Sequence, residues 1–235
     1  MDRPIVLVTG AGGALGSAVR ERLTRDGARL ALLARRAPAG EAGGPAADGA
    51  AEPAPWAAAV DLLDEAAVTD AIDRAETELG PVRAALLLAG GFATAPAAET
   101  DLGALRQQLD VNLATAASVV RALLPRMTER GEGTIVGIAA GQARRGGSGA
   151  AAYAASKAAL AAYLRAVDEE SASRGVRTVT VFPMGTLDTP ANRQAMPKAD
   201  PARWIDPARL AEVLAFAVRI GPRARLREIE VHPDA

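Results

Sequence analysis

The chain has 235 residues, of which 49% are hydrophobic and 23% charged, which suits one domain with a substantial buried core. Its formal net charge of -1 gives no electrostatic reason to expect binding to nucleic acid or to an acidic membrane. The sequence contains no Cys and a single His, so disulfides, thiolate catalysis, a usual Ser-His-Asp triad and a zinc site of imidazole or thiolate lack the residues they need.

Short apolar runs alternate along the chain with longer segments in which apolar residues recur every three or four positions. The runs predict strands at residues 5–8, 30–33, 56–60, 84–88, 134–138, 178–182 and 229–231. The longer segments predict amphipathic helices at residues 17–25, 65–79, 102–127, 150–173 and 207–219. Nearly continuous apolar strands followed by helices predict an α/β fold, a doubly wound parallel sheet of about seven strands with helices on both faces.

Two segments interrupt this alternation. Residues 37–55 are rich in Ala, Gly and Pro without any period, which predicts a flexible surface loop. Residues 184–204 follow the carboxyl end of a predicted strand, where irregular loops of such sheets often cover a ligand. No repeat and no change of composition divides the chain, so we expect a single domain over residues 1–235.

The sequence gives no sign of a membrane segment or a secretory leader. The longest uncharged stretch, residues 84–98, is broken by Gly90, Gly91 and Pro96 and is too short for a membrane span. The charged residues Asp2 and Arg3 stand directly before the first predicted strand, unlike the apolar stretch of a leader. We therefore expect a cytoplasmic protein.

A glycine-rich turn joins the first predicted strand to the first predicted helix. Its sequence is Thr9-Gly10-Ala11-Gly12-Gly13-Ala14-Leu15-Gly16. Glycine permits positive φ and lets backbone N–H groups approach a pyrophosphate at a helix N-terminus, where the helix dipole favours negative charge. Such a turn can also serve only as a connection, but its position after the first strand of a β/α chain is the one that nucleotide binding requires.

The end of the second predicted strand bears on which nucleotide is bound. The strand runs into Arg35 and Arg36, with no acid where an NAD-binding fold usually has one for the ribose 2′-hydroxyl. Two guanidinium groups can bind a 2′-phosphate, so we expect NADP(H), with NAD(H) as the alternative. Both could instead be solvated surface residues. Asp61, after the third strand, could accept a hydrogen bond from an adenine amino group or cap the following turn.

Tyr and Lys are rare in this chain, with two of each, yet Tyr153 and Lys157 stand four residues apart in a predicted helix. Residues at this spacing share one face of a helix, so the ammonium would lie beside the phenol. A neighbouring cation lowers the pKa of a phenol, which suits a general acid for carbonyl reduction. The alternative is a Tyr packed at the rim of the fold with a solvated Lys.

Together these motifs resemble the short-chain dehydrogenase/reductase family over nearly the whole chain. The match comprises residues 9–16, Asp61, Ala89-Gly90-Gly91, Asn112, Tyr153 and Lys157. The resemblance implies a Rossmann-type fold in which Tyr153 protonates the substrate oxygen, Lys157 binds the nicotinamide ribose and Asn112 holds a water of a proton relay. Asn112 could equally belong to the core, although a buried Asn needs hydrogen-bond partners. The cofactor site implied by the resemblance also includes Leu62, Pro183, Gly185 and Thr186.

Two positions depart from the family pattern. The family's catalytic Ser, about 13 residues before the Tyr, falls on Ala140, which cannot donate a hydrogen bond to a carbonyl. Ser148, five residues before Tyr153, could replace the missing donor, but we do not expect it to do so. Ala14 stands at the middle Gly of the family's turn, where one methyl group can often be accommodated.

One branch of the family, dihydropteridine reductase, shares both departures. The chain also resembles that branch at Ala89-Gly90-Gly91-Phe92 and along residues 186–200, followed by Trp204. The branch would have an acid at the end of the second strand for NADH, and Asn112 looks more like the wider family. Loss of one oxyanion donor costs about 100- to 1000-fold in ketone reduction, whereas a quinonoid pterin is already an activated acceptor.

We therefore expect an NADPH-dependent reductase of a small activated acceptor, quinonoid dihydropterin-like or carbonyl. A general ketoreductase and a catalytically weak NADP(H)-binding sensor are the alternatives. The predicted helices at residues 102–127 and 150–173 carry many small apolar residues. In the family the corresponding helices form the usual dimer contact, so the resemblance implies a homodimer or homotetramer, unless these faces pack only on the sheet.

Overall fold

The computed structural model describes residues 3–36, 55–220 and 224–234. Its strands are β1 (Ile5–Thr9), β2 (Arg29–Ala34), β3 (Trp56–Ala59), β4 (Val82–Leu87), β5 (Gly133–Ile138), β6 (Val176–Pro183) and β7 (Glu228–Val231). All of these strands pair in parallel in one sheet of order β3-β2-β1-β4-β5-β6-β7. The prediction of a seven-stranded parallel α/β sheet is confirmed. The loop expected at residues 37–55 lies, apart from Pro55, outside the described residues.

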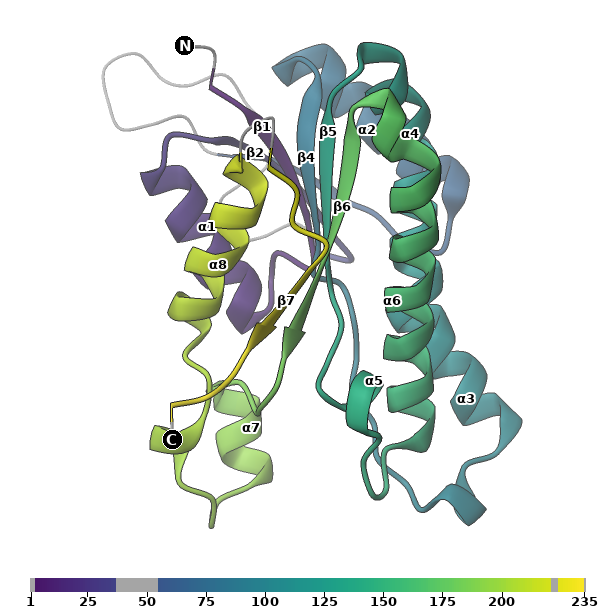
Figure 1. Cartoon of the computed structure of the whole chain (residues 1–235), viewed down its shortest axis with the longest axis vertical. Helices are drawn as coiled ribbons and strands as arrows, with labels where there is room; N and C mark the ends of the chain where they lie inside the picture. Colours follow the sequence, from purple (N-terminus) through teal and green to yellow (C-terminus); the bar gives the residue numbers. More distant parts are fainter. Residues whose placement is uncertain (1–2, 37–54, 221–223, 235) are drawn as a thin grey trace.

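Helices cover both faces of the sheet (Figure 1). They are α1 (Ala14–Arg25), α2 (Glu65–Leu79), α3 (Leu102–Leu109), α4 (Thr115–Arg130), α5 (Gln142–Arg145), α6 (Ala151–Ser171), α7 (Pro190–Ala195) and α8 (Pro207–Arg219). Helices α2 and α8 begin and end where the sequence predicts. Their first residues follow Asp64 and Asp206, whose carboxylates accept hydrogen bonds from first-turn N–H groups and so fix the helix start. Within the described residues, no helix is long and apolar enough to cross a membrane.

Most of the core lies in two apolar layers, one on each face of the sheet. In β1, Ile5 and Leu7 pack in the layer that α2, α4 and α6 cover. Val6 and Val8 point to the other face and pack in the layer beneath α1 and α8. Because β1 is buried on both faces, apolar residues do not alternate with polar ones over residues 5–8, which explains the continuous apolar run in the sequence.

The helix expected at residues 102–127 differs in structure from the prediction. Helices α3 and α4 are joined by a π-helical turn, Asp110–Ala114, with Asn112 at its centre. A π turn places an extra residue in one turn of an otherwise continuous helix, and such turns often lie at functional sites. The apolar spacing continues on both sides of the turn, so the sequence shows one helix where the structure has two.

The segment expected to be an irregular loop at residues 184–204 also contains short helices. Thr189 caps α7, its side chain accepting a hydrogen bond from Asn192 N–H at 3.2 Å, and Pro190 occupies the first helical position. A 3-10 turn, Pro201–Arg203, follows. This segment therefore has its own local structure beside the carboxyl ends of the strands.

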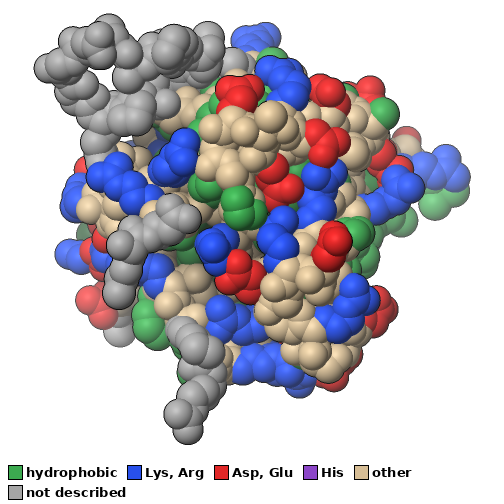
Figure 2. All heavy atoms as spheres, turned by 90° about the horizontal axis from the view of Figure 1, so that it is seen from above, with side chains coloured by type: hydrophobic (Ala, Val, Ile, Leu, Met, Phe, Trp, Pro, Cys, Tyr) green, Lys and Arg blue, Asp and Glu red, His purple; other side chains and the backbone are tan. Residues whose placement is uncertain are grey.

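Parallel pairing brings the carboxyl ends of all the strands to one edge of the sheet, the lower edge in Figure 1. The strand order reverses between β1 and β4, and open α/β sheets bind ligands in the crevice at such a switch point. The glycine-rich turn leaves β1 at this edge, and residues 88–92 leave β4 there. The opposite edge, seen in Figure 2, has basic and acidic side chains lying side by side.

Candidate active site

The glycine-rich turn bends β1 into α1 through close backbone contacts. Gly10 has a φ of +64°, and a Cβ on it would lie 2.8 Å from backbone atoms of Leu88 and Ala89. A Cβ on Gly16 would lie 2.5 Å from the carbonyl oxygen of Gly10. Both positions therefore require glycine. Ala14, at the place of the family's middle Gly, is exposed in the first turn of α1, where its methyl group is accommodated.

The same turn has the properties of an anion site. A Cβ built on Gly12 meets no atom within 4 Å, so the space in front of the turn is open. Gly13 caps α1 without any side-chain hydrogen bond, and the first N–H groups of a helix have no partner within the helix. Open space, available N–H groups and the positive end of the helix dipole fit the pyrophosphate of a dinucleotide. Leu15 is partly buried and packs against the core layer on this face of the sheet.

Thr9 connects the two strands at the switch point. Its Oγ1 accepts hydrogen bonds from Leu88 N–H at 3.0 Å and from Ala89 N–H at 3.1 Å. The side chain is buried at the end of β1. Thr9, expected among the cofactor-binding residues, thus holds the glycine-rich turn against the loop that follows β4.

Asn112 is completely buried, and its side-chain amide is hydrogen bonded on both sides. Its Oδ1 accepts from Gly91 N–H at 3.1 Å, while its Nδ2 donates to the Gly91 carbonyl at 2.9 Å. Nδ2 also lies 3.3 Å from Gln108 Oε1. A Cβ on Gly90 would lie 2.8 Å from Asn112 Oδ1, so the loop passes too close for a side chain there. Asn112 therefore fixes the backbone of Gly90 and Gly91.

The hydrogen bonds of Asn112 extend to the helix that carries the Tyr and Lys pair. Nδ2 of Asn112 donates to Ser156 Oγ at 3.1 Å, and Ser156 Oγ donates to the Tyr153 carbonyl at 2.8 Å. Ser156 was not among the residues expected from the sequence. A Ser beside a Lys on a helix carries no signal by itself, because its partner Asn112 is 44 residues away.

Helix α6 places Tyr153 and Lys157 one turn apart. Lys157 is 6% exposed, and its Nζ donates a hydrogen bond to the Ile138 carbonyl at 2.8 Å. The helix lies close to β5 because Gly137 has no side chain; a Cβ there would overlap Leu164. A Cβ on Gly90 would lie 3.3 Å from Lys157 Nζ, so the ammonium also borders the loop after β4.

Burial determines the protonation of this pair. Desolvation raises the pKa of Tyr153 to about 12 and lowers the pKa of Lys157 to about 8. The lowered pKa expected for Tyr153 is therefore not found in the protein alone, where burial raises it. Burial removes water from the phenol, and the hydrogen bond of Lys157 goes to the Ile138 carbonyl rather than to Tyr153. Tyr153 is thus neutral over the whole physiological range.

The end of β5 lacks a hydrogen-bond donor at the family's Ser position. Ala140 is buried there and presents only a methyl group. Ser148 is exposed in the turn before α6. Phe92 contacts Tyr153, with the ring centroids 4.8 Å apart and an interplanar angle of 88°. Phe92 belongs to a segment that carries the family resemblance, but no role for it could be expected from the sequence.

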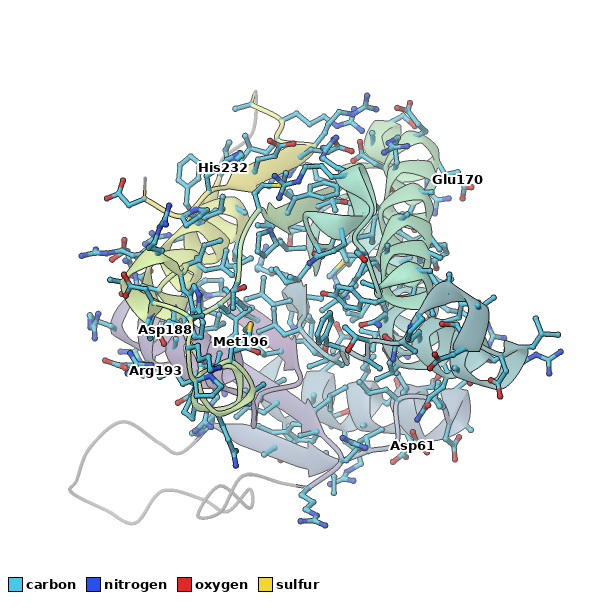
Figure 3. The ribbon with its side chains drawn as sticks, turned by 90° about the horizontal axis from the view of Figure 1, so that it is seen from below. Asp61, Glu170, Asp188, Arg193, Met196 and His232 are labelled. Atoms are coloured by element: carbon cyan, nitrogen blue, oxygen red, sulfur yellow. The ribbon has the colours of Figure 1, made fainter. Side chains whose placement is uncertain are left out.

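The residues expected around the adenine end of a cofactor lie farther along the same edge. Arg35 and Arg36 are exposed directly after β2, and neither has a hydrogen-bond or ion-pair partner among the described residues. Asp61 accepts a hydrogen bond from Leu63 N–H at 3.0 Å, so the turn-capping contact is present, and Leu62 is buried in the core. Figure 3 shows Asp61 apart from the labelled Asp188, Arg193 and Met196.

The segment after β6 is built around an ion pair. Pro183 ends β6 in the core, and Gly185 and Thr186 lead into Asp188. Two hydrogen bonds join Asp188 to Arg193, at 2.6 and 2.7 Å, and the Arg193 guanidinium holds the pKa of Asp188 below its usual value. Figure 3 shows this pair close to Met196, whose side chain is exposed. The Thr186 carbonyl accepts from Ile205 N–H at 2.8 Å, which anchors the segment.

The chain matches the family described as short chain dehydrogenase over residues 4–200. It is 30% identical over 236 residues to glycine betaine reductase of Emericella nidulans. That match covers 97% of this chain but 18% of the relative, so the chain spans less than a fifth of that longer protein. It is 25% identical over 230 residues to an uncharacterized oxidoreductase of Staphylococcus saprophyticus, with 97% of both proteins covered.

Among solved structures, the protein is similar to 3-ketoacyl-(acyl-carrier-protein) reductase from Brucella melitensis, which was crystallised in complex with NADH. The TM-score is 0.81 at 25% sequence identity, and the similarity covers 97% of this chain and 96% of that one. The family expected from the glycine-rich turn and from the Tyr and Lys pair is confirmed. The chain belongs to the short chain dehydrogenase family and is an NAD(P)H-dependent oxidoreductase.

Proposed function

We propose that the protein is an NADPH-dependent reductase in which Tyr153 donates a proton to a small activated acceptor, such as a quinonoid dihydropterin or an activated carbonyl. One observation carries the proposal: Tyr153 and Lys157 lie on α6 at the carboxyl edge of the sheet, joined through Ser156 and Asn112 to the loop after β4. This network brings a proton donor to the switch point, where α/β sheets bind their ligands.

The cofactor side of the proposal rests on the glycine-rich turn and two arginines. A bound nicotinamide cofactor supplies the hydride that the acceptor receives. Residues 10–16 offer the open, positively polarised end of α1 to its pyrophosphate. Arg35 and Arg36 can form charge-assisted hydrogen bonds with a 2′-phosphate, which favours NADP(H) over NAD(H). Lys157, whose Nζ borders Gly90 in the loop after β4, is the residue that would bind the nicotinamide ribose.

The proton side rests on the protonation of Tyr153. With a pKa of about 12, the phenol keeps its proton at neutral pH and can donate it as negative charge develops on the acceptor. Lys157 is half-protonated near pH 8 and hydrogen bonded to Ile138. Asn112 and Ser156 orient the first turns of α6, and therefore the phenol, relative to the loop after β4.

The acceptor is proposed from what the site lacks. Ala140 offers no hydrogen bond to the oxygen of a ketone, and such a donor typically contributes about 100- to 1000-fold in rate. A quinonoid ring already spreads the incoming charge, so it depends less on that donor. This argument and the resemblance along residues 186–200 favour the dihydropteridine reductase branch. A general ketoreductase is the competing proposal.

We also propose that the protein is a homodimer or homotetramer formed through α4 and α6. Leu124 and Tyr163 on these helices are only partly buried, although both pack against the core layer of that face. A second copy with the same helices would cover them across a two-fold axis.

The proposed function predicts that NADPH oxidation with a quinonoid dihydropterin disappears in Tyr153→Phe. Loss of a general acid lowers the rate at least 100-fold, on the order of its usual contribution. Steady-state oxidation of NADPH with the pterin and with a panel of ketones measures this effect, and NADPH binding followed by fluorescence serves as the control. We expect binding within twofold of the wild type. An unchanged rate in Tyr153→Phe would contradict the role of the phenol.

The cofactor preference predicts that Arg35→Ser and Arg36→Ser each lower kcat/KM for NADPH while leaving that for NADH unchanged. Loss of one charge-assisted hydrogen bond corresponds to about a tenfold effect. The exposed Arg106 on α3 gives a matched control, because Arg106→Ser removes the same charge away from the turn. Equal losses for both cofactors would show that the arginines do not read the 2′-phosphate.

The missing donor predicts that Ala140→Ser raises ketone reduction relative to pterin reduction. We expect the ratio of the two kcat/KM values to move toward ketones by about tenfold, a part of what such a donor contributes in its native setting. Ser148→Ala should leave the ratio unchanged, because this hydroxyl is exposed in the turn before α6. A constant ratio in Ala140→Ser would refute the explanation from the missing donor.

The buried Lys157 predicts a pH-dependent stability. Its pKa falls from an unfolded value near 10.5 to about 8, so between these values the unfolded chain binds more protons and the free energy of unfolding rises with pH. From pH 8 to 9.5 the wild type should gain about 1.5 kcal/mol relative to Lys157→Met in urea titrations. Lys198→Met, which removes an exposed Lys, should follow the wild type.

The comparison isolates Lys157 because Lys157→Met keeps Tyr153, whose raised pKa affects stability mainly above pH 9.5 in both proteins. There the sign reverses: the folded protein keeps the phenol proton longer than the unfolded chain, and stability falls as pH rises. If the free energies of unfolding of the wild type and of Lys157→Met changed in parallel from pH 8 to 9.5, the ammonium would not be desolvated in the folded protein.

A further inference from the structure

Phe92 presents an exposed aromatic ring beside the proposed general acid. The ring is 61% exposed, although it contacts Tyr153 edge to face with the centroids 4.8 Å apart. The other large apolar side chains that the described chain exposes are Leu63, Leu102, Met196 and Phe216. Single exposed apolar residues are common, so exposure alone does not indicate a site. The contact with Tyr153 distinguishes Phe92 from the others.

The backbone on both sides of Phe92 is held in place. Gly91, just before it, exchanges two hydrogen bonds with the Asn112 amide, and a Cβ on Gly91 would lie 3.3 Å from Val111. Just after it, Ala95 N–H donates to the Gly149 carbonyl at 2.9 Å. The loop is therefore attached to the π-helical turn before α4 and to the approach to α6. Phe92 is exposed on an anchored backbone.

The arrangement of the two rings leaves a surface for a flat molecule. The planes of Phe92 and Tyr153 are nearly perpendicular, at 88°, so Tyr153 does not cover Phe92 by stacking. Aromatic rings favour offset stacking on one another, and such pairs contribute beyond the area they bury. A flat ring stacked on Phe92 would therefore lie close to the Tyr153 phenol, which Phe92 contacts.

Resting on the proposed function, we propose that Phe92 is a substrate-binding residue that selects flat, unsaturated ring acceptors over open-chain carbonyls. The selection comes from stacking, which an open-chain acceptor cannot match. The usual strength of an aromatic pair corresponds to about 3- to 10-fold in kcat/KM. Ala140 acts in the same direction, because an acceptor that needs no oxyanion donor is one whose charge spreads over a ring.

The test uses the full chain with saturating NADPH and compares a quinonoid dihydropterin with an aliphatic ketone. Phe92→Leu keeps an apolar side chain but removes the ring, and we expect kcat/KM for the pterin to fall about 3- to 10-fold, mainly through KM. The ketone value should stay within twofold. Phe92→Tyr should restore pterin turnover, and Leu102→Ala, which truncates an exposed apolar residue on α3, should change neither acceptor.

A second readout does not depend on turnover. Oxidised pterin, which is flat, is titrated calorimetrically into the NADP-loaded wild type and Phe92→Leu, and binding should be about 3- to 10-fold weaker in the variant. Equal binding to both proteins, or equal losses for pterin and ketone, would overturn the role of Phe92. Binding that depends on Phe92 without any turnover would contradict the proposed function and leave this role standing.

Discussion

Parallel hydrogen bonding between the strands is the constraint on which the site depends. It directs the carboxyl end of every strand to one edge of the sheet. The strand order reverses between β1 and β4, so the segments that follow these two strands separate there. Thr9 bridges this separation by accepting hydrogen bonds from the backbone that follows β4, up to 80 residues along the chain. Asn112 and Ser156 continue the connection to α6. The proton donor is thereby fixed relative to the glycine-rich turn.

Features with a local cause could be predicted from the sequence. Strands buried on both faces are largely apolar, and a capping Asp marks the start of α2 and of α8, so the elements were predictable. The π-helical turn at Asn112 was not, because apolar spacing continues across it. The contacts of Ser156 and of Phe92 arise from segments that meet only in the folded protein. The glycine-rich turn and the Tyr and Lys pair were predictable because each motif is short and continuous.

The spacing of Tyr153 and Lys157 predicted that they share a helix face but could not predict the pKa of the phenol. Two side chains four residues apart on a helix do share a face, but the solvent around them decides the balance between charge attraction and desolvation. Here Lys157 is buried and Tyr153 is partly buried, and the Lys157 hydrogen bond is directed to β5. Gly137 is part of the cause, since its missing side chain lets α6 settle close to the sheet. A packing detail in a strand thus influences an acid on a helix.

The two hydrogen bonds between the Asn112 amide and the backbone of Gly91 have a consequence for the thermodynamics of binding. Glycine gives up more conformational freedom on folding than any other residue. Because the Asn112 amide holds both backbone groups of Gly91, this entropy is lost when the chain folds, before a ligand arrives. The backbone at Gly91, beside the switch point, has no side chain that could obstruct a ligand. Its conformation is already fixed in the folded protein. Binding there can proceed without the ordering cost that a bare glycine loop would impose.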